Sequence, residues 1–286
     1  MARQRSAGSR AGLIALARRY LAALAAGTPA DIALAPDYRA TENGQMADPG
    51  EGLWRSARAF PGHPAILCDE MVGEVVIFGA AEFEELRPFA LRLHIEADMI
   101  SEAEAIISSS AHGFFADVDK LVDADVLYEA PVPSDRGGTR ETLRCAADSY
   151  WVGLAESDGS MVEVNHRADR FANGKKVTNN LEILLSPDKA VHTIASLLTA
   201  TRPARPQVRE KRFPILDTVR GVSASIAIVD FADDPQNPRP DAGSFYIMNA
   251  MKVVDGQIRI IDAIHQILPR GAVSAWSGTN GSNDSG

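Results

Sequence analysis

The sequence is poor in cysteine. Only Cys68 and Cys145 occur among its 286 residues, and neither has a second Cys or a His at the spacing of metal ligands. A zinc site and a disulfide framework are therefore not indicated. Unpaired thiols are typical of a reducing compartment, so we expect a cytoplasmic protein.

Several motifs that mark nucleotide-binding or hydrolytic centres are also missing. The chain has no glycine-rich phosphate loop and no H-E-x-x-H, G-x-S-x-G or C-x-x-C motif. Nucleotide, metalloprotease, serine-hydrolase and dithiol chemistry are thus disfavoured. Acid–base chemistry by side chains remains, with no cofactor and no metal.

Positive charge and long apolar runs are scarce. The formal net charge is -9, and no segment approaches the roughly 20 apolar residues of a membrane span. The basic stretch from Arg202 to Arg212 is interrupted by prolines and a glutamate, and it is interpreted as a solvated loop. We therefore expect no nucleic-acid partner and no membrane partner.

The N-terminal segment allows two interpretations. Arg18 and Arg19 precede a short apolar run that ends at Gly27, which resembles a twin-arginine export signal. The run is short for the apolar core of such a signal. Apolar residues also recur at helical spacing, which favours an amphipathic helix: Leu13, Leu16, Ala17, Tyr20 and Leu24.

Extended segments follow the first helix. Residues 35–45 are predicted to be extended and to end at the Asn43–Gly44 turn. Residues 140–156 are predicted to form a second helix. The other predicted strands, rich in β-branched or alternating apolar residues, are 73–79, 89–96, 99–107, 162–177, 221–231, 245–254 and 257–267.

The two halves of the chain repeat the same order of elements. Thr41–Gln45 aligns with Phe171–Lys175, and Ala97–Glu104 aligns with Asp255–Asp262. A duplication with a period of roughly 130 to 160 residues explains both alignments. We predict an α+β protein of two tandem cone-shaped repeats, each a curved antiparallel sheet packed with helices. Residues 8–112 and 139–277 form the repeats, 113–138 an exposed linker with a short helix, and 278–286 a flexible tail.

Short sequence strings resemble one particular superfamily. A long helix followed by antiparallel strands is similar to the nuclear-transport-factor-2-like superfamily, which includes ketosteroid isomerase, scytalone dehydratase and limonene epoxide hydrolase. Within it, the chain resembles a tandem family that contains bacterial diarylpropane lyases. The strings that carry the narrower resemblance are Leu34–Pro36, Glu42–Gln45, Gly50–Trp54, Asp169–Gly174, Arg212–Pro214 with Asp217, Arg220–Gly221, Leu268–Pro269 and Ser274–Trp276.

The resemblance implies an activity. Diarylpropane lyases remove formaldehyde from lignin-derived two-ring diols without a cofactor, through a quinone-methide intermediate, so a small aromatic substrate is expected. Isomerisation, dehydration or epoxide hydrolysis of a terpenoid or polyketide is the alternative within the superfamily. A binding or dimerisation module is a third possibility, since fold does not fix function. A homodimer is compatible with all three.

The densest group of titratable residues lies in the second repeat. His166, Asp169 and Arg170 belong to a segment expected to line the second cone. If His166 and Arg170 share a face, they are candidates for binding and deprotonating a phenol or alcohol. A salt-bridge ladder on the surface is the alternative interpretation.

A second charged group contains Arg212, Asp217 and Arg220. Asp217 is a candidate catalytic carboxylate and the two arginines are candidate substrate ligands. A structural ion pair that fixes the loop is the favoured alternative for this group.

In the first repeat, Tyr38 is a candidate proton donor to a substrate oxygen. Glu42 and Asn43 are candidate substrate ligands, although residues of these types also stabilise turns. His94 and His265 complete the candidate substrate ligands. For His94 solvent exposure is favoured, and for His265 a hydrogen-bonded position in the core.

Overall fold

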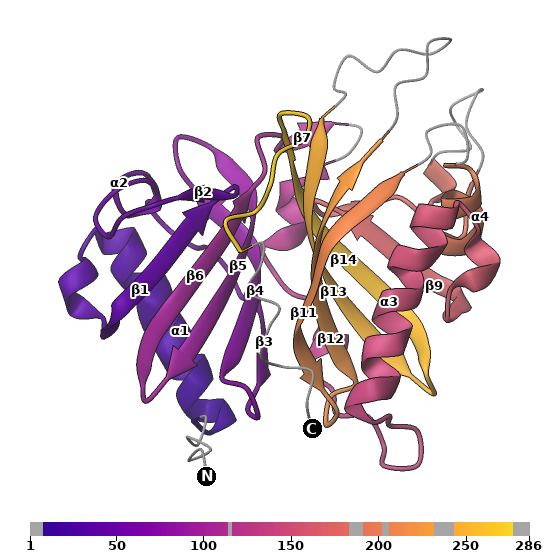
Figure 1. Ribbon diagram of the computed structural model, residues 1–286, viewed down its shortest axis with the longest axis horizontal. Helices are drawn as coiled ribbons and strands as arrows, with labels where there is room; N and C mark the ends of the chain where they lie inside the picture. Colours follow the sequence, from indigo (N-terminus) through magenta and orange to yellow (C-terminus); the bar gives the residue numbers. More distant parts are fainter. Residues whose placement is uncertain (1–7, 114–115, 183–190, 202–205, 232–242, 277–286) are drawn as a thin grey trace.

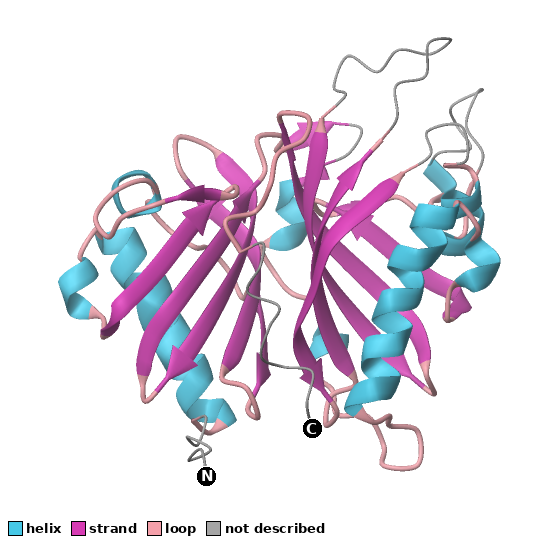
Figure 2. Cartoon of the chain, viewed as in Figure 1, coloured by secondary structure: helices cyan, strands magenta, loops and turns pink. Residues whose placement is uncertain are grey.

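The computed structural model describes residues 8–276 except 114–115, 183–190, 202–205 and 232–242. Within these residues the chain forms two halves of one design. Each half is a six-stranded curved sheet with a long helix on its outer face (Figures 1 and 2). The predicted α+β class and the two tandem cone-shaped repeats are confirmed.

The first sheet has the strand order β2-β1-β6-β5-β4-β3. Its helix α1 covers the outer face. The elements of this half are α1 (Arg10–Ala26), η1 (Pro29–Asp31), β1 (Leu34–Glu42), β2 (Gln45–Met46), α2 (Leu53–Ser56), β3 (Ala65–Asp69), β4 (Glu74–Glu82), β5 (Leu86–Glu96) and β6 (Met99–Ile107).

The second sheet repeats this order as β10-β9-β14-β13-β12-β11. Helices α3 and α4 lie on its outer side (Figure 1). The elements of this half are α3 (Arg140–Glu156), η4 (Gly159–Met161), β9 (Val164–Ala172), β10 (Lys175–Lys176), α4 (Ile194–Thr199), β11 (Gln207–Asp217), β12 (Val222–Asp230), β13 (Ser244–Val254) and β14 (Gln257–Leu268).

Both sheets are mixed, which corrects the prediction of purely antiparallel sheets. β1 pairs in parallel with β6, and β9 pairs in parallel with β14, whereas the other ladders are antiparallel. The reason is topological. The first strand of each half lies beside the last strand. In the first sheet β3 runs opposite to β1, and the three reversals from β3 to β6 bring β6 back to the direction of β1; the second sheet repeats this.

The two long helices begin and end with similar caps. The side chain of Ser9 accepts a hydrogen bond from the backbone N–H of Gly12, and Thr139 does the same for Thr142. At the other end, Gly27 and Ser157 adopt the left-handed conformation that terminates a helix.

No helix in the described part of the chain is both long and apolar enough to span a membrane.

The two Asn–Gly turns make the same hydrogen bonds. The side-chain oxygen of Asn43 accepts from the N–H of Ile107 at 2.8 Å, and its amide donates to the Ile107 carbonyl at 3.1 Å. Asn173 makes the equivalent bonds with His265 at 2.9 and 3.3 Å. Both asparagines therefore fasten the last strand of their sheet, and this shared device supports the duplication.

The two sheets pack against each other through their inner faces. We call this the central core. Its apolar residues come from both halves, including Val76, Phe78, Ala90 and Ile106 from the first sheet and Ile226, Met248, Ala250 and Ile264 from the second. Two further cores lie between each sheet and its own helices. The described residues therefore form three apolar cores, of which the two on the helix side fill the interiors of the cones.

The segment between the halves is not the exposed linker that the sequence suggests. It contains β7 (His112–Gly113), β8 (Ala116–Asp117), η2 (Val118–Leu121) and η3 (Val126–Tyr128). Val118, Leu121 and Tyr128 are buried in the central core. Their side chains add apolar contacts that join the two sheets.

The basic stretch is also only partly a loop. Residues 202–205 lie outside the described residues, but Gln207–Asp217 forms strand β11. Arg209 and Arg212 tolerate this position because carboxylates face them: Arg209 binds Asp230 and Arg212 binds Glu104. The basic residues of this stretch made the edge strand β11 look like a solvated loop in the sequence.

A buried ion pair joins the two halves. Two nitrogens of Arg212 on β11 donate to the two carboxylate oxygens of Glu104 on β6 at 2.8 and 2.6 Å. Tyr246 also donates to Glu104, whose side chain is fully buried. Burial alone would raise the pKa of Glu104, but the Arg212 charge reverses this and lowers it.

We predict that Arg212→Met destabilises the protein by roughly 3 kcal/mol, because it leaves most of the Glu104 charge uncompensated in the interior. Urea unfolding followed by tryptophan fluorescence measures this change. The double variant Arg212→Met/Glu104→Met is expected to recover most of the loss. A single variant as stable as the unmodified protein would contradict this assignment.

Candidate functional site

Strand register matches the interiors of the two cones position by position. In the first sheet Thr41 lies opposite Glu104, and in the second sheet Phe171 lies opposite Asp262. Glu104 and Asp262 are therefore equivalent, as the sequence alignment predicts. Counting along the neighbouring ladders extends the match to every strand of the two sheets.

The matched interiors differ in polarity. Five positions on the helix-covered face of the first sheet are apolar: Val75, Ile77, Leu91, Ala40 and Ile107. Their counterparts in the second sheet are, in the same order, Ser223, Ser225, Asn249, Arg170 and His265. At these five positions the first cone is apolar, whereas the second cone has hydrogen-bonding or titratable groups.

Asn249 is one of three fully buried polar residues at these positions. It is completely buried on β13, and within the described residues neither its amide oxygen nor its amide nitrogen has a hydrogen-bond partner. The hydroxyl of Ser223 is in the same situation. Unpaired buried polar groups cost roughly 1 to 3 kcal/mol each, so this interior is suited to a water molecule or a polar ligand.

Arg170 brings a positive charge to the same cone. Its Nε donates to the hydroxyl of Tyr150 on α3 at 3.0 Å, and the guanidinium lies 6.0 Å from the Tyr150 ring centroid. Among the described residues no carboxylate forms a salt bridge with Arg170. The guanidinium of Arg170 therefore has a hydrogen-bond partner but no ion-pair partner in the described part of the chain.

His265 stands at the end of the same interior on β14. Its ring lies 5.6 Å from that of Phe245, and its Nε2 is 3.5 Å from the amide nitrogen of Asn173. Burial, with the nearby charge of Arg170, lowers the pKa of His265 to about 4. The imidazole is therefore neutral at pH 7.

These groups complement one another chemically. A neutral imidazole is a general base, a tyrosine hydroxyl is a proton donor, and an unpaired guanidinium stabilises a phenolate or alkoxide. Sequence analysis selected Arg170 and His265 but missed Tyr150 and Asn249. The signal for Asn249 was present, because it is a lone amide in the apolar run of residues 245–254.

His166 does not accompany Arg170 into the cone. His166 is exposed, whereas Arg170 is partly buried. The backbone is irregular here, since the register with β14 shifts and the Asn165 side chain accepts a hydrogen bond from the N–H of Arg167. The simple alternation used in the sequence analysis therefore fails between residues 164 and 169.

Asp169 points away from the helix-covered face. Its carboxylate accepts from Lys176 at 2.8 Å and from the Asn179 amide at 3.1 Å. These contacts hold β10 and the following turn against β9. The structure thus separates His166, Asp169 and Arg170, which the sequence places in one cluster.

The polar residues of the first cone are engaged with their own half. Tyr38 and Tyr20 share a hydrogen bond of 2.7 Å between their hydroxyls, and burial raises the pKa of Tyr38 to about 12. Glu42 accepts from the backbone N–H of Leu53 at 2.6 Å, which fixes α2. Asn43 makes two hydrogen bonds to the backbone of Ile107 and so fixes its turn. All three side chains therefore form hydrogen bonds that hold elements of the first half together.

The group of Arg212, Asp217 and Arg220 also lies apart from the second cone. Asp217 forms a salt bridge with Arg10 of α1 at 2.9 Å. The Nε of Arg220 donates to the backbone carbonyl of Glu129 at 2.9 Å. With the Arg212–Glu104 pair, these contacts join segments distant in sequence.

His94 is less exposed than the sequence suggests. Its side chain is 22% exposed, and its two ring nitrogens lie 3.1 Å from Glu74 and 3.0 Å from Glu96. The hydrogen bond to Glu74 is the main reason why the pKa of His94 rises to about 9. His94 therefore belongs to an ion-pair network on the inner face of the first sheet.

One group of described residues has the geometry to hold a metal ion. Ligand atoms of His112, Asp117 and Asp119 lie within 4.8 Å of one another. This group lies on the segment between the sheets, and His112 and Asp119 are exposed. It shares no residue with the interior of the second cone.

One protein family matches the second half of the chain. A family described as "Domain of unknown function (DUF8021)" matches residues 136–265, which run from before α3 into β14. No curated protein matches the chain.

Solved structures of similar shape are distant. An LEH-like epoxide hydrolase of M. tuberculosis is 15% identical, covers 44% of this chain and 84% of its own, and gives a TM-score of 0.30. A putative ketosteroid isomerase from Kribbella flavida is 13% identical over 47% and 84%, with a TM-score of 0.30. An NTF-2 like protein of unknown function from Burkholderia xenovorans is 13% identical over 52% and 100%, with a TM-score of 0.28. Likeness at this level says nothing about activity.

We predict that Arg170→Gln raises the pKa of His265 above its value of about 4, toward the 6.5 of a free imidazole, because the charge that opposes its protonation is removed. Titration of the imidazole by two-dimensional NMR measures the shift. Lys211→Gln removes a positive charge that is paired with Asp148 and is the matched control. An unchanged His265 titration in Arg170→Gln would refute the proposed coupling.

Proposed function

We propose that the chain is an acid–base enzyme that works in the second cone without a metal or nucleotide cofactor. Its substrate is a phenol or a similarly apolar alcohol. The observation that carries this proposal is the contrast between the two interiors: Arg170, His265 and Asn249 replace apolar residues at matched positions. Polar groups in such a place are costly, and function is the usual reason for them.

Each group has a proposed role. His265 accepts the proton of a substrate hydroxyl, since its imidazole is neutral at pH 7. Arg170 stabilises the oxyanion that forms, and the Tyr150 hydroxyl protonates the departing group. The Asn249 amide and the Ser223 hydroxyl bind polar atoms of the substrate.

The specific reaction that we propose is cleavage of a lignin-derived phenolic diarylpropane-1,3-diol, in keeping with the family resemblance of the sequence. Loss of the benzylic hydroxyl as water forms a quinone methide. Removal of the terminal hydroxyl proton then breaks the adjacent carbon–carbon bond, and the electron pair passes into the quinone methide. The products are one stilbene, one water and one formaldehyde, so atoms and electrons balance.

Further features of the sequence analysis remain proposals. They are the repeat boundaries of 8–112 and 139–277, a cytoplasmic location, a small aromatic partner and a homodimer. Face-to-face packing of curved sheets, which made a dimer plausible, is used here within one chain. A homodimer would therefore use another surface.

Activity is tested by incubating the metal-stripped protein with a racemic phenolic diarylpropane-1,3-diol and following stilbene absorbance and formaldehyde release. We expect both products in equal amounts. Product without formaldehyde would favour an isomerase or dehydratase, and absence of any turnover would favour a binding module.

We predict that Arg170→Gln and His265→Asn each lower kcat/KM at least about 100-fold, the size usual for oxyanion and acid–base groups. His63→Asn, whose side chain is 94% exposed, controls for nonspecific effects. His166→Asn separates two hypotheses, because a large loss there would support the sequence-based choice of His166 as the base. Near-normal rates in both Arg170→Gln and His265→Asn would contradict the proposed roles.

A further inference from the structure

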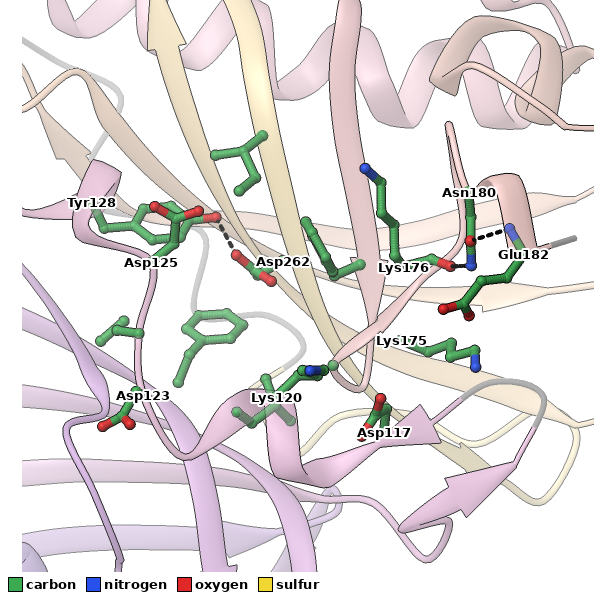
Figure 3. Close-up of a pocket in the computed structure, with 17 residues that line it drawn as sticks. Asp117, Lys120, Asp123, Asp125, Tyr128, Lys175, Lys176, Asn180, Glu182 and Asp262 are labelled. Atoms are coloured by element: carbon green, nitrogen blue, oxygen red, sulfur yellow. Dashed lines mark hydrogen bonds between the residues drawn. The ribbon is translucent and has the colours of Figure 1, made fainter.

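A cavity of about 440 Å³ lies between the two halves, on the inner side of the second sheet (Figure 3). It is separate from the interior of the second cone, because its residues belong to the opposite face of β9 and β14. Much of its wall is apolar, formed by Ala65, Phe78, Leu121, Ala124, Tyr128, Phe171 and Ile260.

Asp262 is a partly buried carboxylate in the wall of this cavity. Its carboxylate accepts a hydrogen bond from the Tyr128 hydroxyl at 2.8 Å. Among the described residues no cation forms a salt bridge with it. Figure 3 shows Asp125, Tyr128 and Asp262 together on one side of the cavity and Lys175 and Glu182 on the other.

The first sheet shows how the equivalent carboxylate is neutralised. Glu104 is bound by Arg212 and lies 3.7 Å from Arg92. Arg92 pairs with Glu104 across the ladder, and the residue in the same place opposite Asp262 is Ala250.

The position that matches Arg212 is also occupied by alanine. Arg212 lies opposite Ile226, and Ile226 corresponds to Phe78 in the first sheet. The residue opposite Phe78 is Ala65, which lines the cavity. Alanine therefore stands at both places where the first site has arginine. The second carboxylate lacks both cations, and one of these two alanines, Ala65, lines the cavity.

An aromatic side chain completes the first site. The indole of Trp276 donates to the hydroxyl of Thr41 at 2.9 Å and lies under the guanidinium groups of Arg39 and Arg92, at 4.6 and 5.5 Å. Thr41 corresponds to Phe171, which lines the cavity. The chain itself thus fills the first site with cationic and aromatic groups, while the matching second site is open.

We propose that this cavity binds a small organic cation, an amine or amidine on an aromatic or apolar body, whose charged group pairs with the carboxylate of Asp262. Phe78, Phe171 and Tyr128 supply aromatic surface for the body and for cation–π contact. Five carboxyl residues line the cavity against three lysines, of which Lys176 is already paired with Asp169. The surroundings therefore favour a cation over an anion.

The protonation of Asp262 agrees with this assignment. Burial raises its pKa to about 6 and the charge of Asp125 adds to this rise, while the hydrogen bond from Tyr128 and the charge of Arg170 oppose it. The carboxyl is thus ionised above pH 7 but remains poorly stabilised. A bound cation would supply the missing partner.

Benzamidine and benzamide are a suitable pair of probes, because they have nearly the same shape and only benzamidine is charged. Isothermal titration calorimetry at pH 7.5 and low salt compares their binding to the full chain. We expect saturable binding of benzamidine and binding of benzamide that is at least about tenfold weaker, as for loss of a charge-assisted hydrogen bond.

Two variants locate the binding. Asp262→Asn removes the charge with little change of shape and is expected to weaken benzamidine binding at least about tenfold. Glu156→Gln removes one exposed negative charge at the end of α3 and is the matched control, with unchanged affinity expected. Equal binding of the two probes, equal affinity for Asp262→Asn, or no binding of benzamidine up to millimolar concentration would each overturn the proposal.

Discussion

The structure depends on the packing of two inner sheet faces against each other. A single sheet with a helix on one side would leave its other face exposed, and that face contains residues such as Val76, Phe78, Met248 and Ile264. Burying both faces in one central core removes this apolar surface from water, which is the main favourable term in folding. The Arg212–Glu104 pair and the buried residues between the halves then fix the orientation of the two sheets.

This arrangement allows the two cones to differ. Stability requires only that the cores be well filled, and the first cone meets this requirement with Val75, Ile77 and Leu91. The second cone has Ser223, Ser225 and Asn249 in their places, and of these only Ser225 has a partner in the described part of the chain, the indole of Trp151 at 3.0 Å. Two halves of one design can thus keep the same strand order and differ in the polarity of their interiors. The same asymmetry appears at the inner faces, where Glu104 is neutralised and Asp262 is not.

Much of the architecture could be predicted from the sequence, because it depends on local patterns. The helical spacing of Leu13, Leu16 and Tyr20 gave the first helix, and the two Asn–Gly turns revealed the duplication. Edge strand β11 was missed because its alternation is masked by basic residues whose partners lie far away in the chain. The parallel pairing of the first and last strands depends on how the sheet closes, which no local pattern encodes.

The candidate site was harder to predict for the same reason. Arg170 and His265 were found as titratable residues on predicted strands, but their neighbours Tyr150 and Asn249 come from a helix and another strand. His166 was placed beside Arg170 by strict alternation, which the irregular backbone of β9 breaks. The hydrogen bond between Tyr128 and Asp262 could not be predicted, because Tyr128 lies in a segment that the sequence suggests is an exposed linker.

The central claim is that the second cone, and not the first, is the functional interior. A crystal structure of the protein soaked with a hydroxystilbene, the product class of the proposed reaction, tests it most directly. The account predicts ligand density on the helix-covered face of the second sheet, with a ligand oxygen within hydrogen-bond distance of Arg170 or Asn249. Density in the first cone, or a second cone that stays closed to ligand and water alike, would contradict it.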